Sequence, residues 1–458
     1  MAVEHEPKTD NAINTVLTAP LHRRALLRSG GGLAAAAGAG ALTIASRGIA
    51  RAQSDDPVSL TFWHHTYPPA DEFIQTKIDE YVGENPNVSI ELVTYPHGDY
   101  ETKLLAAISA GDAPDIINLL DYLYPRYVGD GLLAPVDPAA FGGSSMDDVR
   151  ALYVEKALEG LSADGTVYGV PEEFNTLCLF LNGTHFDDIG LDANDPKNWP
   201  ETWEDLFAVA KELEQRDGDT LTRIGFNWVW NLDPYWYAQQ YWPILRQYDG
   251  NVLDEEGRAA IDSPEAVAMF TEVWQRLITE GMGGPAVATV NPVNALQDFS
   301  DGRQSMMIAG IWAPPAFRDN AEVYDNYVVA PLPQKDPATP RTLLNSYSLT
   351  VGAGSENASD AWRFINYLTS DAGGYIKAAG YINGRKGWAE TPEAKAARGA
   401  ELFAKGQEHG SFVWRSETWT EEGTAIKQAI ENFSQGGATV EDALGQAAEQ
   451  INSIRGVA

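Results

Sequence analysis

The stretch Phe299–Phe317 reads FSDGRQSMMIAGIWAPPAF, and its pattern changes from helix to strand to turn. A polar helix is expected to end at Asp301-Gly302, because glycine readily takes the left-handed conformation that closes a helix. The apolar run Ser305–Ile311 then has the length of a strand covered on both faces. Such strands belong to parallel sheets between helices, where ligands bind beyond the carboxyl ends of the strands. Trp312 stands at that end, either as a ligand contact or as a loop residue that caps the core.

The size and charge of the chain narrow the possible classes of protein. Its 458 residues exceed what one hydrophobic core usually organises, so we expect two α/β lobes. The formal net charge of -33 argues against nucleic acid and anionic membranes as partners. Cys178 is the sole cysteine and lies between Leu177 and Leu179, which excludes a disulfide within the chain and predicts a buried, inert thiol.

The first 52 residues have the features of an export signal. Arg23-Arg24 and the leucines that follow resemble the twin-arginine signal, a Gly/Ala/Leu stretch comes next, and Ala50-Arg51-Ala52 fits a cleavage site. The alternative is an arginine pair ahead of a flexible linker. Cleavage after Ala52 would leave a mature chain from about Gln53, with no cysteine for a lipid anchor. We therefore predict an exported protein, periplasmic or at the cell surface, that is not a lipoprotein.

Strands and helices alternate along the first part of the mature chain. Strands are expected at Val58–Trp63, Val88–Val93 and Asp115–Leu120, with Asp99 as the N-cap of the helix before the third. This alternation is typical of a doubly wound α/β sheet. Further helices are expected to begin at Thr202 and at Ser263, where capping residues precede apolar stripes. The last predicted helices are 359–368, 423–433 and 440–454.

The turn at 162–169 and the apolar run that follows it place the first crossover between lobes near residue 172. We assign residues 53–171 and 304–338 to an N-terminal lobe, because the strand at Ser305 is expected to return the chain there. Residues 172–303 and 339–458 are assigned to a C-terminal lobe.

Tryptophan and tyrosine are abundant, with 13 and 19 residues, and many lie in the segment Asn227–Pro243. A buried indole or phenol needs a hydrogen-bond partner, so cores favour Leu, Ile and Phe instead. The aromatic residues therefore indicate a surface that holds a flat and partly polar molecule, although Trp228, Trp236 and Trp242 are expected to serve packing.

Several short motifs occur in order along the mature chain. They are Val58–Trp63, Gly111–Asp115, Gly131–Pro135, Tyr168–Pro171, Phe180–Asn182, Pro200–Trp203, Phe299–Trp312 and Thr439–Leu444. In this order they resemble the extracellular solute-binding proteins of the carbohydrate-import class, similar to the maltose- and trehalose-type binding components of ABC transporters.

The resemblance implies a type II periplasmic-binding-protein fold, in which two α/β lobes joined by crossover strands close around one sugar without chemistry. It implies a monomer that delivers a mono- or oligosaccharide to membrane permease subunits, and no enzyme activity. The ligand-contacting positions that it implies are Trp63, His64, His65, Asp121, Tyr122, Asn175, Trp230, Tyr235, Tyr237, Trp312 and Trp419. His64-His65 and Asn175 depart from the maltose-type pattern, in which charged residues are common at these places.

The residue types suit a sugar independently of the resemblance. A sugar has an apolar face for aromatic rings and a rim of hydroxyls for fixed polar groups, to which Arg385 could contribute. We expect Trp63, Trp230 and Trp312 to share one hollow. His64 and His65 could instead be solvated loop residues, and Arg385 a surface turn.

Two other functions remain open on the sequence. A polyamine or another small polar solute could bind the same fold, since such sites also combine tryptophan with carboxylates. A glycosidase needs two carboxylates that face one glycosidic bond, whereas Glu172 and Glu173 are adjacent and are expected to point in different directions. No phosphate-binding loop and no spaced ligand set is evident, so we predict neither a cofactor nor a metal site.

Overall fold

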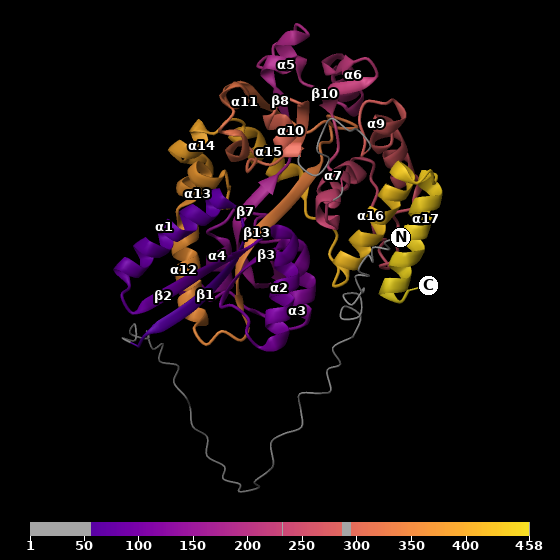
Figure 1. The fold of residues 1–458 in the computed structure, drawn as a ribbon. Helices are drawn as coiled ribbons and strands as arrows, with labels where there is room; N and C mark the ends of the chain where they lie inside the picture. The colour runs from indigo at the N-terminus through magenta and orange to yellow at the C-terminus, as the bar shows by residue number, and fades with distance from the viewer. Residues whose placement is uncertain (1–55, 231, 286–294, 458) are drawn as a thin grey trace, which may run out of the picture. The chain divides into compact units, whose positions relative to one another are not determined.

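The computed structural model describes residues 56–230, 232–285 and 295–457 (Figure 1). The predicted export signal and its cleavage site lie outside these ranges. Within the ranges, no helix combines the length and apolar character that a membrane span requires.

The Phe299–Phe317 stretch folds as its sequence predicts. Helix α10 (Ala295–Ser300) is followed by Gly302 in the left-handed conformation, with a φ of 71°. Strand β11 (Gln304–Ala309) then runs through the interior, and the Pro-Pro turn forms the short helix η5 (Pro314–Phe317). Trp312 lies between the strand and this turn.

The first sheet contains the strands predicted near the start of the mature chain. Its order is β14-β13-β3-β1-β2, and β4 and β7 also pair with β13. The strands are β1 (Val58–His65), β2 (Val88–Tyr95), β3 (Ile116–Leu120), β4 (Leu133–Ala134), β7 (Gly169–Thr176), β13 (Thr342–Gly352) and β14 (Gly410–Ser411). β1 pairs in parallel with β2 and β3, as the βαβ pattern predicts, whereas β13 runs antiparallel to β3.

The second sheet has the order β12-β8-β11-β10-β9. Its strands are β8 (Cys178–Asn182), β9 (Gln215–Asp217), β10 (Thr220–Phe226), β11 and β12 (Tyr327–Ala330). β11 pairs with β8 and β10 here. The prediction that the strand at Ser305 returns the chain to the first lobe is therefore wrong. Its apolar side chains suit the interior of either sheet, so composition could not distinguish them.

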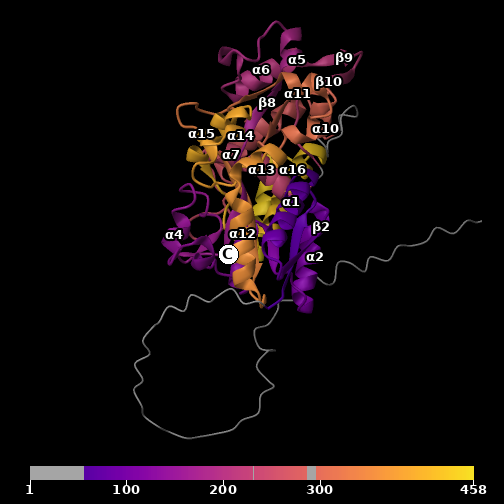
Figure 2. The same ribbon diagram turned by 90° about the vertical axis from the view of Figure 1, so that its left-hand side faces the viewer.

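Two crossovers join the sheets, and they shift the predicted lobe boundaries. The chain leaves the first sheet between β7 and β8, at Leu177, so residues 172–176 belong to the first sheet. It returns between β12 and β13, so residues 342–352 belong to the first sheet and not to the C-terminal lobe. α12 (Ala358–Ser370) also packs on the first sheet beside α1 (Pro68–Glu84), where the Phe364 ring lies 5.2 Å from that of Tyr81 (Figures 1 and 2).

The predicted helices are present, with small changes at their ends. α6 (Trp203–Leu213) has the capping box expected of Thr202 and Asp205, and Ser263 caps α8 (Pro264–Met269). A π-helical turn at Phe270–Trp274 separates α8 from α9 (Arg276–Thr279). α2 (His97–Ala110) begins two residues before Asp99, which lies in its first turn and is not its N-cap. The other helices of eight residues or more are α7 (Pro234–Gln247), α13 (Ala372–Ala379), α15 (Ala400–His409), α16 (Trp419–Gln435) and α17 (Val440–Arg455).

Short elements complete the described chain. The strands β5 (Ser162–Ala163) and β6 (Thr166–Val167) form the hairpin predicted at 162–169. The short helices are η1 (Asp121–Leu123), α3 (Tyr124–Gly129), η2 (Pro138–Phe141), α4 (Met146–Arg150), α5 (Gly183–Asp188), η3 (Pro196–Asn198), α11 (Ala321–Asn326), η6 (Trp388–Glu390) and α14 (Pro392–Ala396).

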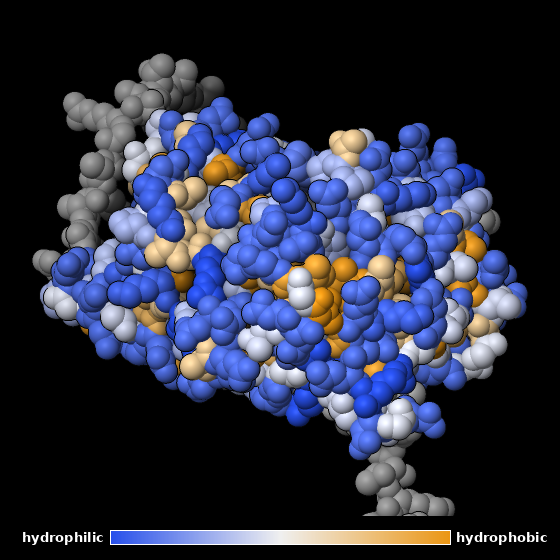
Figure 3. Space-filling view, turned by 90° about the horizontal axis from the view of Figure 1, so that it is seen from above, coloured by the Kyte–Doolittle hydropathy of each residue, from blue (hydrophilic) through white to orange (hydrophobic). Residues whose placement is uncertain are grey.

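Apolar residues form the interior of the protein, and hydrophilic residues form most of its surface. Both sheets are largely buried, and the free thiol of Cys178 is buried in β8, as its apolar neighbours predict. Hydrophilic residues cover most of the face shown in Figure 3. This is the usual distribution for a chain in which 21% of the residues are charged.

Candidate functional site

The end of β1 carries two buried histidines rather than solvated ones. His64 lies between two carboxylates, with Nδ1 2.9 Å from Asp71 and Nε2 3.1 Å from Glu172. Burial alone would lower the pKa of His64, but the two carboxylates outweigh burial and raise the pKa to about 9. Protonated His64 therefore donates a hydrogen bond to each carboxylate and links β1 to α1 and β7.

His65 has the opposite electrostatic setting. Its ring stacks on that of Tyr347 at 4.0 Å, and Nδ1 lies 2.7 Å from the Asn118 side-chain oxygen. Burial, together with the charge of His64, holds the pKa of His65 well below its usual value. The neutral ring of His65 therefore donates from Nδ1 to Asn118 and offers a flat face to Tyr347.

The end of β3 places Asp121 and Tyr122 against α7. One carboxylate oxygen of Asp121 accepts from the Tyr235 hydroxyl at 3.3 Å and from the Ser346 backbone N–H at 3.0 Å. The other oxygen, Oδ2, is buried and has no hydrogen-bond partner among the described residues. Burial raises the pKa of Asp121 to about 6, against the opposing effects of the Ser346 N–H and the Arg415 charge.

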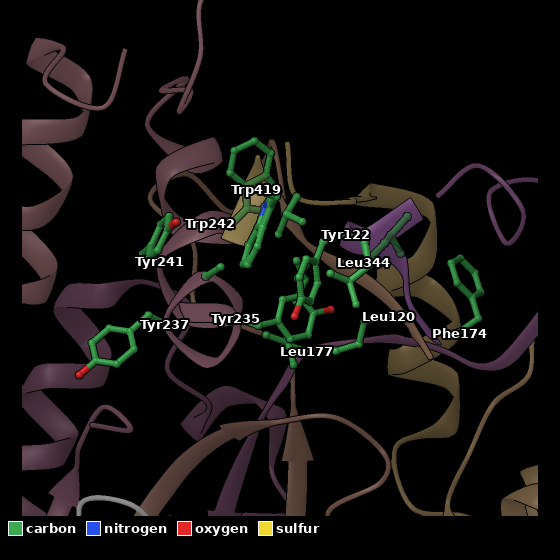
Figure 4. Close-up of a cluster of buried hydrophobic side chains, with 14 of the residues drawn as sticks. Leu120, Tyr122, Phe174, Leu177, Tyr235, Tyr237, Tyr241, Trp242, Leu344 and Trp419 are labelled. Carbon is green, nitrogen blue, oxygen red and sulfur yellow. The ribbon is translucent and has the colours of Figure 1, made fainter. Parts of the chain in front are cut away.

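Tyr122 lies in a group of aromatic rings (Figure 4). Its ring centroid is 4.7 Å from that of Tyr235 and 4.1 Å from that of Trp419. The Trp419 indole N–H has no partner in the described part of the chain. These contacts bring together three predicted residues from η1, α7 and α16.

Asn175 and Trp312 approach each other across Gly310. A Cβ atom built on Gly310 would lie 2.0 Å from the Asn175 amide nitrogen and 2.3 Å from the Trp312 indole nitrogen, so only glycine fits there. The Asn175 amide donates to Glu173 at 2.9 Å, and the Trp312 ring meets the edge of Trp236 at 5.7 Å. Asn175 and Trp312 therefore lie side by side at Gly310.

Glu173 is buried beside this pair. Burial raises its pKa to about 8, the Asn175 hydrogen bond opposes the rise, and the charges of Glu172 and Asp121 add to it. Glu172 is bound by other donors, namely His64, Asn118 at 2.7 Å and Tyr375 at 3.2 Å. The two adjacent glutamates therefore have different partners, as expected.

We call the connected set His64, His65, Asp121, Tyr122, Glu172, Glu173, Asn175, Tyr235, Trp312, Tyr347 and Trp419 the aromatic–carboxylate cluster. Its members come from the carboxyl ends of β1 and β3, from β7 and β13, from the loop after β11 and from α7 and α16. The cluster thus contains side chains from elements of both lobes, and most of these side chains are buried.

Four predicted residues lie outside the cluster, namely Trp63, Trp230, Tyr237 and Arg385. The Trp230 ring is buried against Trp274 and Tyr237, and the Tyr237 hydroxyl donates to Glu431 at 3.1 Å. Tyr237 points away from Tyr235 in Figure 4, because residues two apart on a helix differ by about 200° in direction. Arg385 donates to Asn366 at 2.6 Å and covers the Tyr153 ring at 4.7 Å, so it serves packing in the first lobe.

The three tryptophans expected to share a hollow do not contact one another in the described ranges. The ring of half-buried Trp63 meets Tyr95 at 4.8 Å, Trp230 meets Trp274, and Trp312 meets Trp236. Side-chain alternation along β1 puts Trp63 and its neighbour His64 on opposite faces of the sheet, and the Trp63 ring packs on Tyr95 of β2. Of the three, only Trp312 belongs to the cluster.

Sequence reasoning missed Tyr347 and Glu172 as members of the cluster, and it assigned Trp236, which faces Trp312, to packing. Tyr347 lies on β13, which pairs with both β3 and β7. No local signal marks such a residue, since its place depends on pairing between distant strands. Trp236 lies in the first turn of α7, which Asp233 caps, and this helix start within the aromatic segment Asn227–Pro243 is a local signal that could have identified it.

Two sheets joined by crossovers, with aromatic rings and fixed polar groups where they meet, are typical of a protein that binds a small solute. The family model for bacterial extracellular solute-binding proteins matches residues 66–375. Because this match covers more than half of the chain, the protein belongs to that family.

Individual relatives are distant. The chain is 23% identical over 318 residues to the maltotriose-binding protein of Pyrococcus abyssi and 24% identical over 285 residues to the arabinooligosaccharide-binding protein of Halalkalibacterium halodurans. These matches cover 68% and 60% of this chain but only 62% and 58% of the two relatives.

A solved structure of maltose-bound MalE3 from T. maritima has a TM-score of 0.75 at 21% identity, over 87% of this chain and 100% of that one. At this identity the likeness shows the fold, which is the type II periplasmic-binding fold that the sequence predicts.

Proposed function

We propose that this chain is the extracytoplasmic binding protein of an ABC importer. It captures a mono- or oligosaccharide in the aromatic–carboxylate cluster and presents it to permease subunits in the membrane. The observation that carries the proposal is the contact of Asp121 and Tyr122 with Tyr235 and Trp419, which combines flat rings with a buried carboxylate where the two lobes meet. The names of the two relatives, both of them oligosaccharide-binding proteins, support the same ligand class.

The packing of the cluster supports a hinge mechanism. Asp121, Tyr235 and Trp312 contact their neighbours directly, so a sugar must separate these groups before it can enter. The crossovers at Leu177 and at 331–341 are the places where the backbone can bend. Closure around the sugar would then replace contacts between side chains by contacts to its faces and hydroxyls. No bond is made or broken in this cycle.

A thermal-shift screen tests the ligand class. Maltotriose, arabinooligosaccharides, galactooligosaccharides and common monosaccharides are compared with spermidine and putrescine, because a specific ligand raises the melting temperature by mass action. We expect a saccharide to raise the melting temperature, in proportion to the logarithm of its concentration. A rise in melting temperature with polyamines alone would contradict the saccharide proposal and identify the ligand as a polyamine. The buried carboxylates of the cluster would suit a polyamine as well.

The export route is proposed from the first 52 residues. Arg23-Arg24 and Ala50-Arg51-Ala52 are the features of a twin-arginine signal and its cleavage site. Conversion of both arginines to lysine should keep the protein in the cytoplasm, as cell fractionation and immunoblotting would detect. Unchanged export of this variant would contradict the proposal that the protein uses the twin-arginine route.

A further inference from the structure

The buried oxygens of the cluster point to the chemistry of the ligand. Asp121 is fully buried, and its Oδ2 has no donor among the described residues. Asn345, which precedes the Ser346 N–H that binds Asp121, is 3% exposed, and its side-chain oxygen Oδ1 also lacks a donor. A buried acceptor without a donor costs free energy that a ligand can recover by donating a hydrogen bond. A ligand that donates hydrogen bonds to Asp121 Oδ2 and Asn345 Oδ1 would therefore gain binding free energy.

The charges around these oxygens are not balanced. His64 is engaged by Asp71 and Glu172, so its charge is already paired within the protein. Arg415 donates to the backbone oxygen of Asp121 at 2.8 Å and not to the carboxylate. In the part of the chain that the structure describes, no lysine, arginine or histidine side chain donates to the carboxylate of Asp121 or of Glu173.

The second lobe adds a further carboxylate. Asp233 caps α7 by accepting from the backbone N–H groups of Tyr235 and Trp236. Its other oxygen lies 3.5 Å from Nδ1 of His97 on α2, and both side chains are about one third exposed. This pair links α7 to α2 beside Trp236 and places a further carboxylate near the cluster.

On the basis of the proposed binding function, we infer that the cluster selects its solute by charge and that Asp121 sets the selection. The preferred solute is a saccharide that carries an ammonium group, and phosphorylated saccharides are excluded. An ammonium group donates several hydrogen bonds and supplies the positive charge that Asp121 lacks. A phosphate would place further acceptors and negative charge against an unpaired carboxylate of low accessibility. The net charge of -33 also attracts cationic solutes to the protein at long range, which favours the same selection.

Calorimetry at about pH 7 on the purified mature protein tests the selection. Glucose, galactose and mannose are each compared with the corresponding amino sugar and sugar phosphate, and a chitosan trisaccharide is compared with its N-acetylated form. We expect an ammonium-bearing probe to bind about tenfold or more tightly than its neutral counterpart, and no phosphate to bind measurably. Tighter binding of a phosphate, or failure of every ammonium-bearing probe to bind, would overturn the inference.

The variant Asp121→Asn isolates the charge, because asparagine retains the shape of the side chain. It should reduce the ratio of ammonium to neutral affinity about tenfold. The matched control is Asp147→Asn, which makes the same change of net charge at a side chain that is 92% exposed, and it should leave the ratio unchanged. Circular dichroism confirms that both variants are folded.

The two proposals fail in different ways. Equal affinity for neutral and ammonium-bearing saccharides, with no effect of Asp121→Asn on their ratio, would overturn the charge selection and leave saccharide binding intact. Binding of spermidine without any saccharide would overturn saccharide binding, and the role of Asp121 would stand if Asp121→Asn abolished it.

Discussion

Asp121 and Glu422 are both fully buried carboxylates, but their surroundings differ. Glu422, on α16, accepts hydrogen bonds from the Trp414 indole at 2.6 Å and from the guanidinium of Arg455 at 2.8 Å. The hydroxyls of Ser416 and Thr418 donate to it as well, at 2.6 and 2.7 Å. Asp121 has two donors on one oxygen and none on the other.

The difference separates a carboxylate with a structural role from the one that we propose to contact the ligand. The Glu422 network joins the C-terminal helices, since Arg455 belongs to α17, and the protein itself supplies every donor. Asp121 has a buried oxygen without a hydrogen-bond donor, and this arrangement lowers the free energy of unfolding. Burial by itself therefore does not distinguish the two carboxylates, whereas the missing donor at Asp121 Oδ2 does.

The largest expected effect is on the stability of the C-terminal helices. Glu422→Gln removes the charge that pairs with Arg455, and breaking such a buried pair typically costs about 3 to 5 kcal/mol. Asp121→Asn should instead raise the free energy of unfolding near neutral pH, by up to about 3 kcal/mol, because burial disfavours its charge. Urea denaturation measures both. Equal losses in the two variants would erase the distinction.

Glu173 extends the comparison to pH. Its pKa is raised from 4.5 to about 8 in the folded protein, so the native state binds more protons than the unfolded state between these values. Stability attributable to Glu173 is therefore present below about pH 4.5 and is lost as the pH rises towards 8. Relative to Glu173→Gln, the wild type should lose about 3 kcal/mol over this range.

The measurement is a series of urea denaturations across that range for the two proteins. The difference between their curves isolates Glu173 from other groups, including His64, whose raised pKa affects stability between about pH 6.5 and 9 in both proteins. Glu256→Gln, an exposed glutamate, is the control and should give a curve parallel to the wild type. A Glu173→Gln curve parallel to the wild type would show that Glu173 titrates normally.

Trp312 tests the aromatic part of the cluster. Trp312→Ala removes the ring that faces Trp236 and should weaken saccharide binding about 30-fold, as the loss of a central aromatic contact typically does. Unfolding should stay cooperative, since Trp312 is only partly buried. Calorimetry with the ligand found by thermal shift gives the affinity. Trp199→Ala, at a partly buried tryptophan away from the cluster, should bind normally, and unchanged affinity of Trp312→Ala would remove Trp312 from the site.

Arg385 has the smallest expected effect. Arg385→Lys keeps the charge but loses the hydrogen bonds to Asn366 and Thr369 and part of the contact with Tyr153, at a cost of about 1 kcal/mol. Saccharide affinity should not change, because these contacts lie within the first lobe. A loss of saccharide affinity measured by calorimetry, without a loss of stability, would show that Arg385 contributes to the binding site.

The predicted elements depend on local pattern, and most of them are present. The glycine stop at Gly302, the capping box at Thr202 and the βαβ alternation around β1 and β2 each need only residues close in sequence. The assignment of β11 to a lobe needed its partners, and these are β8 and β10. An apolar strand fits either interior, so the lobe boundaries could not be obtained from composition.

The candidate site follows the same division. The resemblance implied Asp121, Tyr122, Asn175 and Trp312, and all four follow or end strands and belong to the cluster. The resemblance also implied Trp230 and Tyr237, but the turn of the helix and the packing on Trp274 place these two side chains elsewhere.

By itself, the sequence determined that this protein has α/β elements in a particular order, an acidic surface and aromatic residues beside strand ends, because hydrophobic period, charge and capping act over a few residues. The tertiary structure alone decided which sheet each late strand joins and which carboxylate has every donor supplied. These outcomes depend on contacts between distant segments, such as Asp121 with Tyr235 and Ser346, and no local pattern encodes them.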